Sequence, residues 1–96
     1  MSRELLTRAV EAIRTAREAT TDSTTGDSLA ELAAHLQSHA DREATPALGT
    51  LDRVQTKLRV IESETSDPAV SEPLAAAREH ILSFLETLED RGMKQH

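Results

Sequence analysis

The sequence predicts an all-α protein, an antiparallel up-down bundle of four helices. Glycine and proline occur only three times each in 96 residues, and the common residue types Ala, Leu, Glu and Arg are good helix formers. Apolar residues recur at steps of three and four along four separate segments, which places them on one face of a helix. Short connections between such segments favour antiparallel neighbours. The length indicates one domain over residues 1–92, followed by a disordered tail at 93–96.

The first helix is expected over residues 2–20, where Leu6, Ala9, Ile13 and Ala16 form its apolar stripe. A loop is expected over residues 20–26, because its Thr, Ser and Asp side chains compete for backbone hydrogen bonds and a glycine permits a turn.

The second helix is expected to open at Ser28, which forms a capping-box pattern with Glu31. Its apolar stripe consists of Leu29, Leu32, Leu36 and Ala40. The helix should stop near Ala44, because the residue before a proline is pushed out of helical geometry.

The third helix is expected to have Thr45 as its N-cap and Pro46 at its first position. Its stripe consists of Leu48, Leu51, Val54, Leu58 and Ile61. The alternative is a three-helix bundle in which one long helix is only kinked at Pro46. Gly49, in the first turn, is expected to permit close packing against a neighbouring helix.

The fourth helix can be capped by Asp67 and begin at Pro68, but Pro73 favours a late start near residues 71–72 and an irregular first turn. Gly92 is expected to end it. Its stripe steps by four and three, as in a coiled-coil seam: Val70, Leu74, Ala77, Ile81, Phe84 and Leu88.

The net charge of −6 disfavours nucleic-acid binding, because phosphates repel an acidic surface. Phe84 is the one aromatic residue, which counts against base-stacking surfaces and aromatic-lined pockets. No cysteine is present, so thiolate metal sites and thiolate nucleophiles are excluded.

No apolar run is long enough for a signal peptide or a membrane span, which favours the cytoplasm. Serine and threonine are common, but no nucleophile motif with a histidine and an acid is recognisable, so we expect no enzymatic activity and no cofactor.

His35 and His39 are the candidate metal ligands, because residues four apart share one face of a helix. A third ligand could come from Glu31, Glu43 or His80. Both histidines lie about 100° from the leucine stripe, on a flank that faces solvent. No Glu-x-x-His pair is present, although di-iron bundles use that motif. A solvated histidine pair is therefore the favoured interpretation, and we expect no metal site.

Charged side chains on the first and third helices indicate surface pairing at spacings of three and four, as between Glu4 and Arg8. The alternative is an interaction face for an acidic partner. Arg53, Lys57 and Arg59 make the third helix locally positive, with Asp52 opposing them.

Three segments, residues 4–9, 40–53 and 77–86, look familiar in order and spacing. Through them the chain resembles a family of short, acidic, helical haloarchaeal proteins of unknown function. Its most specific element is the pattern Pro46-x-x-Gly49-x-Leu51, where the family has a polar pair and this chain has Ala47 and Leu48. The resemblance implies a compact helical unit in a salt-rich cytoplasm and supplies no activity.

The leading functional prediction is a non-enzymatic helical module that binds another protein or a second copy of itself in a high-salt cytoplasm. The acid excess and nine arginines against two lysines are typical of salt-adapted proteins. The alternative is a bundle that binds a metal or small ligand through His35 and His39.

Overall fold

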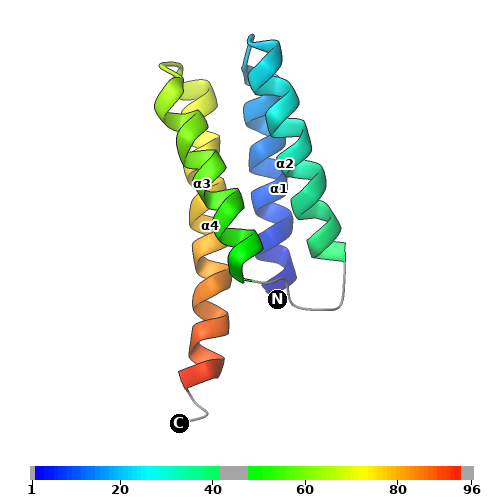
Figure 1. Cartoon of the computed structure of the whole chain (residues 1–96), viewed down its shortest axis with the longest axis vertical. Coiled ribbons are helices and arrows are strands. Elements are labelled where there is room, and N and C mark those ends of the chain that lie inside the picture. The colour runs from blue at the N-terminus through cyan, green and yellow to red at the C-terminus, as the bar shows by residue number, and fades with distance from the viewer. Residues whose placement is uncertain (1, 42–47, 94–96) are drawn as a thin grey trace.

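The computed structural model describes residues 2–41 and 48–93, and these ranges form four helices and no strand. They are α1 (Ser2–Ala19), α2 (Ser23–Asp41), α3 (Leu48–Glu64) and α4 (Pro68–Met93). The helices lie side by side and alternate in direction, so the predicted up-down four-helix bundle is confirmed (Figure 1). Because α2 and α3 are separate helices with opposite directions, the alternative of one long kinked helix is wrong. Thr45 and Pro46 lie outside the described residues.

The core contains the predicted stripe residues whose burial the structure describes, with Ile61 packed against them; the side chains of Leu48 and Leu88 lie outside the described part. Each helix turns its stripe inward, because this removes leucine, isoleucine and valine side chains from water. The large side chains that are fully buried are Leu6, Val10, Ile13, Leu29, Leu36, Leu51, Leu58, Val70, Leu74 and Ile81. Gln55 is the one polar residue buried in the described part of the chain.

The four helix pairs do not pack equally. α1 makes its most extensive contacts with α4 and then with α2, α3 packs mainly on α4, and α2 and α3 barely touch each other. α1 carries alanines at steps of three and four, Ala9, Ala12, Ala16 and Ala19, all buried or packed against the core. Small side chains let a neighbouring helix approach closely. The bundle is therefore tightly packed along three of its seams and loose along the fourth.

α2 begins at Ser23, five residues before the predicted start, so the capping box at Ser28 and Glu31 is wrong. Asp22 is the N-cap. Its Oδ1 accepts a hydrogen bond from the Thr24 backbone N–H at 3.0 Å, and its carbonyl accepts from Gly26 N–H at 2.9 Å. α1 closes with Thr20 N–H donating to the Ala16 carbonyl, so three residues suffice for the turn.

α4 begins at Pro68 with a regular first turn, so the predicted late start is wrong. Asp67 Oδ1 accepts from Ala69 N–H at 3.0 Å, and the Asp67 carbonyl accepts from the N–H groups of Val70 and Ser71, both at 3.0 Å. Pro73 lies inside the helix. It cannot donate to the carbonyl of Ala69, but that residue is exposed and water can reach it.

The last helix runs to Met93, one residue beyond the predicted end at Gly92. Met93 was assigned to the tail and is helical, and the other tail residues, 94–96, lie outside the described part. The lower end of α4 extends past the other three helices (Figure 1). No helix in the described ranges combines the length and hydrophobicity that a bilayer crossing needs.

Candidate functional site

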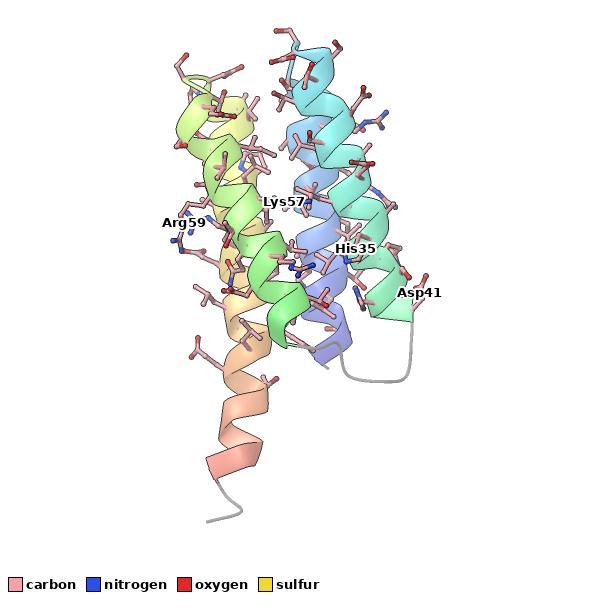
Figure 2. All side chains as sticks on the ribbon, viewed as in Figure 1. His35, Asp41, Lys57 and Arg59 are labelled. Atoms are coloured by element: carbon pink, nitrogen blue, oxygen red, sulfur yellow. The ribbon has the colours of Figure 1, made fainter. Side chains whose placement is uncertain are left out.

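The candidate site is the surface on either side of the loose seam between α2 and α3. An antiparallel helix pair is related by an approximate two-fold axis, so equivalent positions on both helices face the seam. On α3, the residue that faces the seam is the one just before a core residue. Lys57 precedes the core residue Leu58 and lies on the side of α2, whereas Arg59 points away from α2 (Figure 2). By the same rule, His35 on α2 precedes Leu36 and faces the seam.

We call this surface the α2–α3 face. It consists of Glu31, His35 and His39 on α2 and of Arg53, Lys57 and Val60 on α3. Each of them directly precedes a residue of the apolar stripe. His39 is half-buried and the other five are exposed.

The two predicted histidines do come together. Their ring centroids lie 4.8 Å apart with the planes at 82°, an edge-to-face contact between successive turns of α2. Two imidazoles alone do not make a zinc site, which takes three or four protein ligands. The described residues contain no group of three or more His, Cys, Asp or Glu side chains that could hold a metal ion. Of the proposed third ligands, Glu43 lies outside the described residues, and Glu31 and His80 do not complete a cluster.

The predicted pairing of surface charges along α1 is wrong for Glu4 and Arg8, which do not form an ion pair within 4 Å. Exposed pairs gain little in water, so long side chains remain solvated. The ion pair that the described residues do form joins α3 to α4: Arg78 donates through Nε and Nη2 to the Glu62 carboxylate, the second bond at 3.0 Å. The two side chains keep only 25% and 16% of their exposure.

This bidentate pair fixes the relation between α3 and α4. The hydrogen bond that Arg78 donates to the Glu62 carboxylate raises the pKa of Arg78 above its ordinary value, against the opposing effect of burial. A raised folded-state pKa adds stability that is present at every pH below the ordinary pKa of arginine and is lost only in strong alkali. Glu62 also defines the sides of α3. Arg59, three residues earlier, shares the side toward α4, which confirms that Lys57 lies on the side toward α2.

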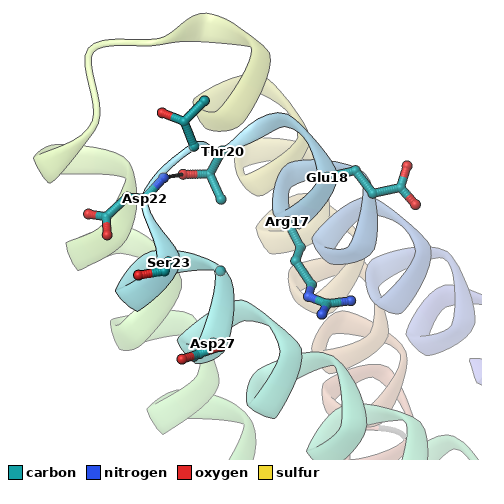
Figure 3. A pocket seen from close by; sticks show the side chains of 8 residues that line it. Arg17, Glu18, Thr20, Asp22, Ser23 and Asp27 are labelled. Atoms are coloured by element: carbon teal, nitrogen blue, oxygen red, sulfur yellow. Dashed lines mark hydrogen bonds between the residues drawn. The ribbon is translucent and has the colours of Figure 1, made fainter.

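A hollow lies at the turn between α1 and α2 and is open to solvent, with a volume of about 270 Å³ (Figure 3). Asp22 N–H donates to Thr20 Oγ1 at 3.2 Å, and Asp22 Oδ2 accepts from the Thr25 hydroxyl at 3.2 Å. These groups are used in capping α2 and in shaping the turn. The hollow is therefore a consequence of the chain reversal rather than a built ligand site.

The sequence located the histidine pair and the cations of α3 but did not show that they border one seam. That relation depends on which helices are neighbours and how closely they pack. One signal was available: Leu32, Leu36 and Ala40 on α2, and Val54 and Leu58 on α3, each directly follow a charged or imidazole side chain.

One family model matches residues 1–87, and its description is a family of unknown function (DUF7553). No curated protein and no solved structure matches the chain. The matched range covers all of α1, α2 and α3 and most of α4. The chain therefore belongs to this family of unknown function, as a four-helix bundle with one loosely packed seam.

Proposed function

We propose that this protein is a non-enzymatic interaction module that binds another protein or a second copy of itself. The observation that carries the proposal is the unequal packing of the bundle. Three pairs of neighbouring helices pack closely, and the fourth pair, α2 and α3, makes few contacts and is bordered by the exposed residues Glu31, His35, Arg53 and Lys57. These exposed side chains are available to a partner.

Two further features support binding to a macromolecule rather than to a small ligand. The α2–α3 face extends over more than two turns of each helix, which suits another helical surface better than a compact molecule. Val60 adds an apolar contact to it, since 49% of its surface is exposed. Protein interfaces combine such apolar contacts with a polar rim.

We propose a high-salt cytoplasm as the working environment. The support is compositional: seventeen acidic residues face eleven basic ones, and arginine exceeds lysine nine to two. An excess of carboxylates repels itself in dilute buffer, and salt screens that repulsion. The family resemblance described above points the same way.

The test has two arms. Sedimentation equilibrium of the full chain from micromolar to submillimolar concentration, in dilute and in molar KCl, measures self-association. Affinity capture of the tagged chain from its own cells, followed by reconstitution with the purified candidate, measures binding to another protein. A chain that is monomeric throughout and reconstitutes with no partner would overturn the proposed function.

A further inference from the structure

The charges on the α2–α3 face are segregated by helix. α2 contains no lysine or arginine between Ser23 and Asp41, and its acidic residue on this face is Glu31, which is exposed. On the other side of the seam, α3 presents Arg53 and Lys57, also exposed. No ion pair in the described part of the chain joins the acids of α2 to these cations, although the helices are neighbours. Both sets of charges are therefore available to an outside partner.

The register of these charges follows from the helix ends. Asp41 ends α2 and Leu48 begins α3 at the same end of the bundle, and the two helices run in opposite directions (Figure 1). At equal rise per residue, Glu31 then lies level with Lys57, and His35 lies level with Arg53. The acid of one helix and the cation of the other are at the same height.

We propose that the partner of the α2–α3 face is a second copy of the chain, packed about a two-fold axis that runs parallel to the helices. This inference rests on the proposed function and names its partner. Such an axis brings α2 of one copy against α3 of the other and keeps every residue at its own height. Glu31 then contacts Lys57 of the second copy, and symmetry makes this contact twice. A two-fold axis that lies in this face perpendicular to the helices would instead pack acidic α2 against acidic α2. Charge repulsion therefore favours the axis parallel to the helices.

The size of the face suits a weak dimer. A helix of 19 residues is roughly 28 Å long, and two neighbouring helices are about 20 Å wide. Each copy would contribute roughly 560 Å², and the pair of copies about 1,100 Å², at the lower limit for specific interfaces. In molar salt the screening length falls to about 3 Å, so only charges in direct contact still attract. We therefore expect a dissociation constant in the micromolar range or above.

The experiment uses charge reversals that the two-fold arrangement couples. Glu31→Lys and Lys57→Glu each convert two attractive contacts into two repulsive ones, and each should weaken dimerisation about tenfold or more by sedimentation equilibrium. The double variant should return to the wild-type dissociation constant. An equimolar mixture of the two single variants should also dimerise, because every contact in the mixed dimer is again attractive. If Glu31 paired with Lys57 of its own chain instead, mixing the two single variants could not restore that pair.

Two matched controls change the same charges elsewhere. Arg59→Glu lies on the opposite side of α3, and Glu11→Lys is exposed on α1, so both should dimerise like the wild type. Circular dichroism of each variant confirms that the helices remain. A dimer that ignores both single reversals, or a mixture that does not recover, overturns this arrangement and leaves the interaction function standing. A wild-type chain that stays monomeric at submillimolar concentration also overturns it, and partner capture then decides the function.

Discussion

Replacing Asp22 with alanine tests which residue starts α2. In the structure the Asp22 side chain accepts a hydrogen bond from Thr24 N–H and another from the Thr25 hydroxyl. Loss of an N-cap of this kind costs about 1 kcal/mol, and the missing negative charge at the helix N-terminus adds roughly 0.3–1 kcal/mol in dilute buffer. For a domain of this size, each 1 kcal/mol corresponds to about 4–8 °C in thermal midpoint. We therefore expect Asp22→Ala to lower the midpoint by about 5–15 °C.

The matched control is Ser28→Ala, at the residue where the sequence pattern places the cap. Ser28 lies inside α2, where alanine is the better helix former by a few tenths of a kcal/mol, so this variant should melt at or slightly above the wild type. Asp22→Asn keeps the acceptor oxygen and should recover most of the loss. Thermal unfolding followed by circular dichroism measures all three. A larger loss in Ser28→Ala than in Asp22→Ala would refute the assignment of the cap.

Four further predictions use the same unfolding assay. Gly49→Ala should stabilise the fold by up to about 1 kcal/mol, because a Cβ at that helical position meets nothing within 4 Å; a loss would mean that the site is crowded after all. Leu36→Ala should cost about 2–5 kcal/mol, because Leu36 is fully buried; a cost below 1 kcal/mol would show that the core can collapse around it. Molar KCl should raise the midpoint above its value in dilute buffer, because salt screens the net charge of −6; equal midpoints would contradict this. Zinc should leave the midpoint unchanged. A site with a dissociation constant of 1 μM would, at 100 μM metal, add about 2.7 kcal/mol to the free energy of unfolding. Such a gain, absent from the double variant His35→Ala/His39→Ala, would restore a metal-binding function.

The core could be predicted from the sequence because burial follows periodicity. Leucine and isoleucine at steps of three and four leave one inward face, whatever the details of the turns. Leu36 and Leu58, read from the pattern alone, are both fully buried. The interpretation of Gly49 was wrong for a related reason. A small residue permits close packing, but only the arrangement of neighbours decides whether anything approaches it, and at Gly49 nothing does.

Helix starts were harder to predict, because several residues compete for each cap. Between Thr20 and Ser28 almost every side chain can accept a backbone N–H. The cap falls on Asp22 because α1 ends at Ala19 and its next N–H still bonds back to Ala16, which leaves a turn of three residues. α2 therefore begins about one turn earlier than the pattern at Ser28 predicts. At α4 the same logic places the start at Pro68, and Pro73 costs one hydrogen bond near an exposed end rather than shifting the start.

The loose seam also has a physical explanation in side-chain chemistry. On the flanks that α2 and α3 turn toward each other, Glu31, His35, Arg53 and Lys57 would lose hydration if the helices closed together, and burying an unpaired charge is costly. α1 instead presents a row of alanines and makes the most extensive contacts of the bundle with α4. The charged and imidazole side chains on these flanks therefore account for the separation of α2 from α3.

The proposed self-recognition rests on how positive and negative charges are distributed along these flanks. A helix that needs only solubility can mix the two signs, as α1 does: Arg8, Glu11, Arg14 and Glu18 alternate along its exposed surface. Mixed charges give no preferred partner, because attraction and repulsion cancel at most registers. On the α2–α3 face the acid, Glu31, lies on α2 and the cations, Arg53 and Lys57, lie on α3, with Glu31 level with Lys57. Such a pattern attracts its own two-fold image in one register and repels it in the alternative, which is the property that a self-recognising face requires.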